Sequence, residues 1–446
     1  MSRQSYWKYK PSGVEWLGEI PEDWEAKRLR FLVSEPLKYG ANESAEMDDP
    51  TLPRYIRITD VDENGRLRDD TFKSLPEHVA RPYLLKDGDL LLARSGATVG
   101  KSFYYEPSWG RAAYAGYLIR ARFNPARMMP RFVNYFTNSQ EYWQWLYSSF
   151  IQATIQNVSA EKYANLTVPV PPADEQRAIA TFLDRETERV NALIEKKQRQ
   201  IELLQEKRSA LISHAVTKGL DPNAKMKDSG IEWLGQIPAH WTVMAIKFAL
   251  AIPITDGPHE TPEFLPEGIP FLSAESVKDD RLDFSRKRGF ISEEDYIRFS
   301  KKYIPKRGDV YMVKSGATTG NVARVETDEV FNIWSPLAVL RPNPTQSSTD
   351  FIFYFMKSRP FLASVELAWS YGTQQNIGMG VVSNLRIALP PVEEQHAIVL
   401  ELNAKTKKID ALTNKVRDSI DTLREYRTSL ISAAVMGKID VRKEVS

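Results

Sequence analysis

The feature that most constrains this chain is an internal repeat, because residues 12–221 return in the same order at residues 229–440. The segment from Ser12 to Pro21 (SGVEWLGEIP) returns from Ser229 to Pro238 as SGIEWLGQIP. The offset between the copies drifts only from 217 to 220 residues. We therefore expect each copy to be one complete structural unit of about domain size. Two copies of one fold can form a pseudo-twofold object, which suits a target with two related halves.

Composition excludes several classes of protein. The 446 residues include no cysteine, which rules out disulfides, thiol catalysis and cysteine-ligated metals. No apolar run approaches the roughly 18 residues that would span a bilayer, and the N-terminus lacks the apolar centre of a signal peptide. We therefore expect a cytoplasmic protein with no membrane partner. A net charge of +2 gives no argument for nucleic acid from the chain as a whole.

Each copy begins with a globular part, from about Trp24 to Leu166 and from about Trp241 to Leu385. Short apolar runs that follow Gly-Asp turns, at residues 89–93 and 309–313, predict strands. The segments 130–136 and 351–356 are compatible with helix or strand, and periodicity does not decide between them. We predict a mixed α and β (α+β) fold for both globular parts.

Each copy then continues into a long helical pattern in which apolar residues follow a strict four-three alternation. Sustained heptads of this kind predict a coiled coil. Even the flaws match, with Thr187 and Thr406 early in the pattern and Arg208 and Arg427 late in it. The predicted seam consists of Leu183, Val190, Ile194, Ile201, Leu204 and Leu211 in the first helix and Leu402, Ile409, Val416, Ile420, Leu423 and Leu430 in the second.

The ends of these helices are marked as well. Proline and acidic residues near residues 172–175 and 391–394 suit a first helical turn, and Gly219 and Gly437 stand where a C-terminal cap belongs. A helix from Asp174 to Lys218 would be roughly 65 Å long. Pseudo-twofold symmetry requires the two helices to pair antiparallel, so that residues near Leu183 approach residues near Leu430. The alternative is that each helix packs on its own globular part.

A glycine-rich turn occurs once in each copy, as RSGATVG from Arg94 to Gly100 and as KSGATTG from Lys314 to Gly320. The first turn resembles a phosphate-binding loop, but it has three residues between its glycines where that motif needs four. Asn321 also replaces the lysine that would reach the terminal phosphates. We interpret the element as a strand and turn whose backbone amides and side chains contact phosphates, or else as a tight turn that only supports the fold. The candidate residues are Arg94, Ser95, Thr98 and Lys101, with Lys314, Ser315 and Thr318.

Two amide-bearing turns precede the helices, with Gln156 and Asn157 in the first copy and Gln375 and Asn376 in the second. Amide side chains can read adenine in the major groove. A residue that discriminates between sequences should differ between two modules, and these do not. A structural turn or a phosphate contact is therefore favoured over base reading.

Other candidate groups carry weaker signals. Basic and aromatic residues interleave in the globular parts and can build a surface that faces nucleic acid, although any soluble fold has such residues. No histidine has the spacing of a metal site, no pair of carboxylates suggests acid–base catalysis, and we predict no catalytic and no metal-binding residue. The interleaved groups are Arg54, Tyr55 and Arg57; Arg66 and Arg68; Arg111, Tyr114, Tyr117, Arg120 and Arg122; and Arg281, Arg286, Lys287 and Arg288.

The whole pattern resembles the specificity subunit of Type I restriction-modification enzymes. The resemblance rests on the two SGxEWLGxIP openings, the two SGATxG turns, the two Gln-Asn turns, and the proline joins with Glu175-Gln176 and Glu394-Gln395 that lead into the long helices. It covers almost the entire chain, and the duplicated order makes it specific.

The resemblance implies two target recognition domains, at residues 24–165 and 241–385, each binding one half of a split, asymmetric DNA site. It implies conserved helical regions at 166–222 and, with the C-terminal tail, at 386–446. Repeat-opening segments at 1–23 and 223–240 complete the chain. By the same resemblance, the residues of the glycine-rich and Gln-Asn turns are the candidate DNA-binding residues.

The resemblance further implies partners and chemistry outside this chain. The helical pair would act as a ruler and dock two methylation subunits, and restriction–translocase subunits would complete the enzyme. S-adenosylmethionine, ATP and magnesium would bind to those partners, and this chain would hold no cofactor. Two other readings stay open: a self-contained nuclease or NTPase, which the failed loop spacing disfavours, and a coiled-coil scaffold without a nucleic-acid role.

Overall fold

The computed structural model describes residues 4–62, 65, 67–96, 98–148, 157–368 and 376–444. Two compact units make up the chain: unit 1 is Met1–Gln198 with Asp418–Ser446, and unit 2 is Arg199–Arg417. Neither unit equals one copy of the repeat. The expectation that each copy is one complete structural unit is therefore wrong, because each unit takes helical residues from both copies.

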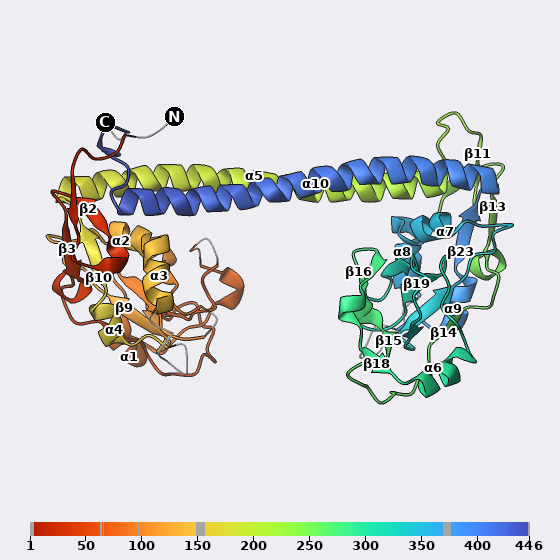
Figure 1. Cartoon of the computed structure of the whole chain (residues 1–446), viewed down its shortest axis with the longest axis horizontal. Helices are drawn as coiled ribbons and strands as arrows, with labels where there is room; N and C mark the ends of the chain where they lie inside the picture. The colour runs from red at the N-terminus through yellow and green to blue at the C-terminus, as the bar shows by residue number, and fades with distance from the viewer. Residues whose placement is uncertain are drawn as a thin grey trace. The chain divides into compact units, whose positions relative to one another are not determined.

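Unit 1 contains a globular part of mixed α and β structure (Figure 1). Its strands are β1 (Tyr9–Pro11), β2 (Glu19–Pro21), β3 (Glu25–Arg28), β4 (Lys38–Tyr39), β5 (Arg54–Ile56), β6 (Leu90–Ala93), β7 (Ser102–Tyr104), β8 (Ala112–Tyr114), β9 (Leu118–Ala121) and β10 (Thr167–Val170). Its short helices are α1 (Glu77–Ala80), α2 (Pro130–Phe136), α3 (Gln140–Ser148) and α4 (Ala160–Ala164). The main sheet has the strand order β4-β9-β6-β7, and all of its pairs are antiparallel.

Unit 2 has a globular part of the same class with a larger sheet in the order β14-β22-β19-β20-β17-β16. Its strands are β11 (Met226–Asp228), β12 (Gln236–Pro238), β13 (Thr242–Ala245), β14 (Thr255–Asp256), β15 (Ile269–Leu272), β16 (Val277–Lys278), β17 (Arg281–Leu282), β18 (Gly289–Ile291), β19 (Val310–Val313), β20 (Val322–Arg324), β21 (Asn332–Ile333), β22 (Leu337–Leu340) and β23 (Arg386–Leu389). Its short helices are α6 (Glu293–Ser300), α7 (Thr349–Met356), α8 (Arg359–Leu367) and α9 (Met379–Asn384).

The local predictions hold in both units. The apolar runs after the Gly-Asp turns are the central strands β6 and β19, in which every residue is buried. The two ambiguous segments are helices, α2 and α7. Pro130 begins α2, where its fixed φ suits the first turn, and the Ser348 hydroxyl caps α7 by accepting from the Phe351 amide at 3.0 Å.

The long helices are α5 (Ala173–Lys218) and α10 (Val392–Val435), and each contributes residues to both units. Gly219 and Gly437 follow them with φ of +74° and +66°, a backbone conformation that favours glycine, so the predicted caps are confirmed. Every predicted seam residue is buried or half-buried. These apolar stripes therefore face protein rather than water.

Within each unit the two helices run antiparallel. In unit 1, Leu183 of α5 lies in one apolar cluster with Leu430 of α10, and Figure 1 shows the start of α5 beside the blue end of α10. In unit 2, Arg208 donates from Nε to Asp410 Oδ1 at 3.0 Å, and the apolar cluster joins Val216 to Leu402. Each helix pair also packs on its globular part, so helix pairing and packing on the globular part occur together.

A buried glutamine ties each globular part to the start of a long helix. Gln176 Oε1 accepts from the Met129 amide at 2.7 Å, and its Nε2 donates to the Pro171 carbonyl at 2.8 Å. Gln395 repeats both bonds, accepting from the Ser348 amide at 2.8 Å and donating to the Pro390 carbonyl at 2.9 Å. The Glu-Gln joins of the repeat thus act as clamps between backbone segments.

The expected fold, with two pseudo-repeated mixed α/β parts and two long helices, is confirmed. The boundaries predicted for the recognition domains and helical regions stay a prediction. No helix among the described residues is long and apolar enough to cross a membrane.

Candidate functional site

The described residues of the two glycine-rich turns make matching backbone hydrogen bonds in both units. In unit 1 the turn connects β6 to β7, and the Gly100 amide donates to the Ala93 carbonyl at 2.9 Å. In unit 2 the turn connects β19 to β20, and the Gly320 amide donates to the Val313 carbonyl at 2.8 Å. These glycines have φ of +86° and +95°, which a residue with a side chain rarely adopts. The turn shape is therefore built into both sequences.

The structure joins each glycine-rich turn to the asparagine turn that lies far from it in sequence. Ser95 forms an antiparallel bridge with Asn157, and the Val158 amide donates to the Arg94 carbonyl at 2.8 Å. In unit 2, Ser315 forms the same bridge with Asn376. The Ile377 amide likewise donates to the Lys314 carbonyl at 2.8 Å. Two motifs that were predicted separately thus form one composite site in each unit, while Gln156 and Gln375 lie outside the described residues.

The basic residue of the composite site has a different environment in the two units. Arg94 of unit 1 is half-buried and stacks on the ring of Tyr39, with its guanidinium carbon 4.7 Å from the ring centre. Its Nε also faces Asn157 Oδ1 at 3.4 Å. Stacking and this contact orient the guanidinium without neutralising its charge.

Lys314 of unit 2 instead pairs with a buried carboxylate. Its Nζ lies 3.2 Å from Asp256 Oδ2, and the Lys314 side chain is 12% exposed. Asp256 also accepts from Lys302 and lies 3.1 Å from His259 Nε2. Burial raises the pKa of Asp256, but the hydrogen bonds from Lys302 and Lys314 outweigh it and hold that pKa below its ordinary value. The charge of Lys314 is therefore compensated inside the protein.

Tyr39 and Asp256, which the sequence analysis missed, occupy equivalent places. Tyr39 ends β4, which pairs with β9, and Asp256 ends β14, which pairs with the corresponding strand β22. Each is followed by a glycine, Gly40 or Gly257, that packs directly against backbone atoms. Gly40 and Gly257 are separated by the offset of the repeat. This spacing could have identified Tyr39 and Asp256 as equivalent positions from the sequence.

The remaining residues of the predicted site differ in exposure. Lys101 and Thr318 are exposed, and Ser95 and Ser315 are half-buried. Thr98 is half-buried, and its hydroxyl oxygen is buried without a hydrogen-bond partner among the described residues. Exposed donors therefore lie on both turns.

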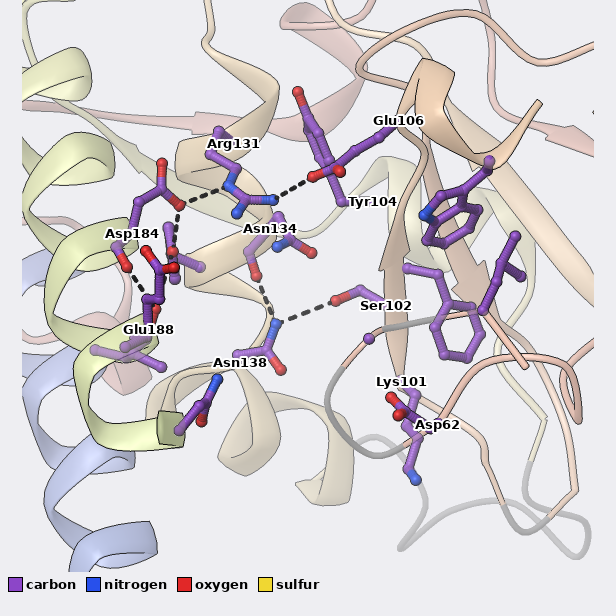
Figure 2. A pocket seen from close by; sticks show the side chains of 18 of the residues that line it. Asp62, Lys101, Ser102, Tyr104, Glu106, Arg131, Asn134, Asn138, Asp184 and Glu188 are labelled. Carbon is purple, nitrogen blue, oxygen red and sulfur yellow. Dashed lines mark hydrogen bonds and ion pairs between the residues drawn. The ribbon is translucent and has the colours of Figure 1, made fainter. Parts of the chain in front are cut away.

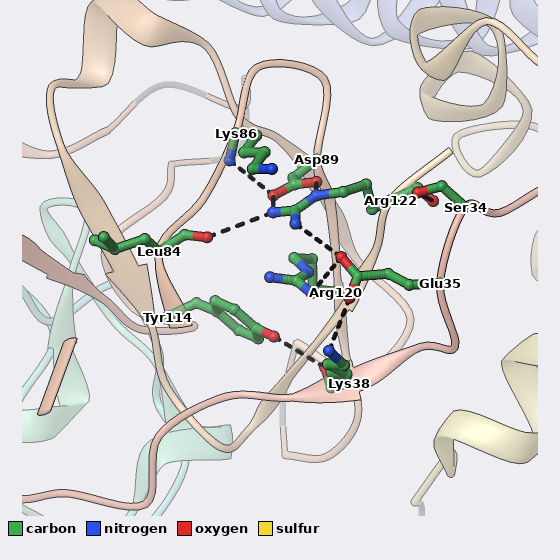
Figure 3. A network of polar contacts seen from close by, with 9 residues as sticks. All are labelled: Ser34, Glu35, Lys38, Leu84, Lys86, Asp89, Tyr114, Arg120 and Arg122. Atoms are coloured by element: carbon green, nitrogen blue, oxygen red, sulfur yellow. Dashed lines mark hydrogen bonds and ion pairs between the residues drawn. The ribbon is translucent and has the colours of Figure 1, made fainter. Parts of the chain in front are cut away.

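Several of the interleaved arginines are structural. Figure 3 shows Arg122 donating to both oxygens of the buried Asp89, at 2.7 and 2.6 Å. Arg122 and Arg120 also donate to Glu35, at 2.7 and 2.9 Å. The hydrogen bond from Lys38 is the main cause that holds the pKa of Glu35 below its ordinary value; burial opposes it, and the two arginines add to it. These arginines stabilise the sheet, so the suggestion that they face a ligand is wrong for them.

The same correction applies to Arg57 of that set, and Arg341, which is outside the set, repeats the pairing in unit 2. Arg341 makes the equivalent bidentate pair with Asp309 in unit 2, at 2.6 and 2.8 Å. Arg57 pairs in the same way with the buried Asp60, at 3.0 and 2.8 Å. Bidentate pairs of this kind are specific in geometry and engage the guanidinium with a carboxylate of the protein itself.

Unit 1 also contains a cavity of about 1140 Å³ between its globular part and its helices. Figure 2 shows Arg131 on its wall, donating from Nε to Asp184 Oδ1 at 2.8 Å and from Nη1 to Glu106 Oε1 at 3.3 Å. Asn138 donates to the Asn134 carbonyl at 2.7 Å. The pair between Arg131 and Asp184 holds the globular part against α5.

Arg427 of α10 is one of the residues that line this cavity in unit 1. In unit 2 its repeat equivalent, Arg208 of α5, is contacted by the turn between β16 and β17. Asp280 of that turn accepts from Lys357 and lies 3.3 Å from Arg208 Nη2, the counterpart of Arg427 in unit 1. No group of three or more histidine, aspartate or glutamate residues in the described parts of the chain is arranged to hold a metal ion.

Comparisons with known proteins agree with this geometry. A family model described as "Type I restriction modification DNA specificity domain" matches the chain twice, at residues 21–203 and 260–422. The Type I restriction enzyme MjaVIII specificity subunit of Methanocaldococcus jannaschii is 23% identical, over 95% of this chain and 94% of the relative. The EcoKI specificity subunit of Escherichia coli is 21% identical, over 95% of this chain and 90% of the relative.

A solved structure shares the fold. The study is described as "Structural basis underlying complex assembly and conformational transition of the type I R-M system", and one of its chains superposes with a TM-score of 0.70. The match covers 94% of this chain and 99% of that chain, at 18% sequence identity. At this identity the likeness shows the architecture alone.

Proposed function

This chain belongs to the family of Type I restriction-modification specificity subunits, and we propose that each of its two units binds one half of a bipartite, asymmetric site in double-stranded DNA. The single observation that carries the proposal is the composite site found in both units. The same joined turns recur, with Ser95 bridged to Asn157 and Ser315 bridged to Asn376. A shared backbone with different surrounding side chains suits two modules that hold DNA alike and read different bases.

The contacts at this site favour phosphate positioning over base reading by the turns themselves. The elements shared by both units are backbone bridges, glycines and asparagines, which carry no difference that would distinguish two half-sites. The units differ around the turns, where Arg94 stacks on Tyr39 and Lys314 pairs with Asp256. Bases are then read by side chains outside the shared turns.

We propose that the chain has no catalytic activity of its own and acts within a complex. Two methylation subunits would bind it and hold S-adenosylmethionine. Restriction–translocase subunits would bring ATP-driven movement and cleavage, with magnesium. The paired α5 and α10 would dock the methylation subunits and set the spacing between the half-sites, because half-site spacing follows protein geometry.

Mapping of methylated adenines tests the proposal. The chain is expressed with the methylation subunits of its own system, and the genome of the host cell is sequenced for modified bases. We expect one motif with two specific blocks separated by a gap of fixed length. Replacing residues 241–385 with the corresponding segment of another specificity subunit should change one block and leave the other block and the gap intact. A continuous motif, or a change in both blocks, would overturn the proposal.

A further inference from the structure

Each unit exposes one phenyl ring at the same place in its fold. Phe31 lies in the short 3-10 turn Leu29–Phe31 after β3, and Phe248 lies in the corresponding turn Ile246–Ala249 after β13. Leu29 and Ile246 of the same turns are buried, whereas Phe31 is 56% exposed and Phe248 is 61% exposed. The core of neither unit uses these rings.

A cation precedes each ring in the sequence, and both cations are held in the same way. Arg30 donates to Asn165 Oδ1, at the end of α4. Lys247 donates from Nζ to Asn384 Oδ1 at 2.9 Å, at the end of α9, and its Nζ lies 5.2 Å from the centre of the Phe248 ring. Each asparagine is fixed in turn, because its Nδ2 donates to the carbonyl four residues earlier, at 3.0 Å in unit 1 and 2.7 Å in unit 2.

Repetition is what separates these rings from ordinary exposed residues. A single exposed apolar side chain needs no explanation. Tyr147 and Tyr117, two exposed rings of the described residues, do not recur: Tyr147 has Glu366 at the equivalent position, and Tyr117 has Pro336. Leu193 and Leu412 also recur, but they lie on the long helices, to which docking is already assigned. The exposed ring with its anchored cation is thus present once in each unit.

We propose that Phe31 with Arg30, and Phe248 with Lys247, are two copies of one docking surface, and that each copy binds one methylation subunit. This inference rests on the proposed function, from which the two identical partners follow. Two copies of one protein require the same surface on both units, whereas two different DNA half-sites do not. A complementary surface on the methylation subunit would have an apolar pocket that binds the phenyl ring and a carboxylate at the edge of that pocket that pairs with the cation.

The DNA backbone is the competing ligand, because it too is the same for both units. The exposed ring argues against it, since phosphate contacts come from cations and polar groups and gain nothing from a phenyl. Each cation is also partly engaged by its asparagine. The observations therefore favour a protein partner.

The test uses the full chain with the methylation subunits of its own system. Phe31→Ala, Phe248→Ala and the double variant are compared with the matched double control Tyr117→Ala with Tyr147→Ala, which removes comparably exposed but unrepeated rings. Native mass spectrometry counts the methylation subunits per chain, and titration measures their affinity. We expect each single variant to lose one methylation subunit at concentrations where wild type holds two, with affinity at that surface reduced at least tenfold. The double variant should lose both, and the control should keep both.

Three outcomes separate the possibilities. Two methylation subunits bound to the double variant with wild-type affinity would overturn the docking surface. Normal assembly with loss of DNA binding would also overturn it and assign the rings to DNA. If the variants lose methylation subunits as expected but the wild-type complex methylates no bipartite site, the docking surface stands and the proposed DNA recognition fails. The double variant Arg30→Glu with Lys247→Glu gives a second test. Reversal of both charges should weaken binding of the methylation subunits more than the double variant Phe31→Ala with Phe248→Ala does.

Discussion

At the scale of single residues, the two units place different chemistry at one backbone position. Arg94 keeps its charge because its neighbour is the Tyr39 ring, whereas Lys314 lies against the carboxylate of Asp256. An ion pair inside the protein leaves less charge for an external phosphate. The composite site of unit 1 should therefore attract DNA more strongly through this residue than that of unit 2.

Arg94→Ala and Lys314→Ala form a matched pair that measures this difference. In the complex with methylation subunits, Arg94→Ala should weaken DNA binding roughly tenfold and lower the slope of log affinity against log salt by about one, as expected for one lost phosphate contact. Lys314→Ala should change DNA affinity by less than about twofold. Fluorescence anisotropy over a salt series measures both, and equal effects of the two variants would contradict the asymmetry.

The buried Asp256 should make unit 2 sensitive to acid. Its pKa is lowered in the folded protein, so its carboxylate contributes stability that is fully present above its unfolded pKa, about 3.9, and is lost as pH falls through the lower folded value. The difference in free energy of unfolding between wild type and Asp256→Asn should be constant above about pH 5 and shrink below about pH 4. Denaturant unfolding over this pH range measures it, with Glu263→Gln, an exposed carboxylate, as control. A difference that grows on acidification would contradict the assignment.

At the scale of elements, the joins between globular part and helix rest on polar side chains inside apolar surroundings. Gln176 and Gln395 are buried, and each bonds to one backbone carbonyl in buried surroundings and one backbone amide in partly buried surroundings. A buried donor or acceptor that loses its partner costs more than the bond itself contributes, because the group stays desolvated. Loss of either glutamine should therefore lower the free energy of unfolding by more than its hydrogen bonds themselves contribute.

Replacing either clamp with leucine should destabilise its unit. Gln176→Leu or Gln395→Leu should lower the free energy of unfolding by about 1–3 kcal/mol, because the amide and carbonyl groups that the glutamine satisfied stay buried. Urea unfolding of the full chain measures the loss. Lys196→Gln and Lys407→Gln, which change exposed residues of the same two helices, should stay within about 0.5 kcal/mol of wild type.

The direction of helix pairing can be tested directly, since the chain has no native cysteine to interfere. The structure places Asn191 beside Arg427 and Arg208 beside Asp410. Cysteine pairs at 191 with 427, and at 208 with 410, should be joined by a short bismaleimide. Residues 191 and 410 are equivalent in the repeat and would meet only if the helices ran parallel. Efficient linkage of 191 to 410 within one chain, seen by peptide mass spectrometry, would contradict the antiparallel arrangement.

At the scale of the whole molecule, the repeat and the compact units do not coincide. Each unit combines the start of one long helix with the end of the other. Each long helix contributes residues to both units, whereas each globular part belongs to one unit. A change in helix length is therefore a change in an element that both units contain. This links the proposed spacing function to the helices rather than to the globular parts.

Inserting four residues between Glu195 and Leu204 tests that link. The insertion adds about 6 Å of helix, and we expect the gap in the methylated motif to grow by about one or two base pairs while both specific blocks stay the same. Mapping of methylated adenines measures the gap and the blocks together. Altered blocks with an unchanged gap would count against a ruler function.

Local patterns in the sequence determined much of this protein. The heptads and capping glycines predicted α5 and α10, the Gly-Asp turns predicted β6 and β19, and the duplicated motifs identified the family, because each depends on residues close together in the chain. The tertiary structure alone decided which partners meet. Strand register and long-range packing bring Asn157 to Ser95 and place Arg94 on a tyrosine ring. They also place Lys314 beside a carboxylate and pair Arg122 with the buried Asp89. The spacing of residues in the sequence does not specify such long-range contacts. The sequence therefore predicted a set of candidate cationic residues, but it could not distinguish those that form ion pairs inside the protein from those that can bind an external ligand.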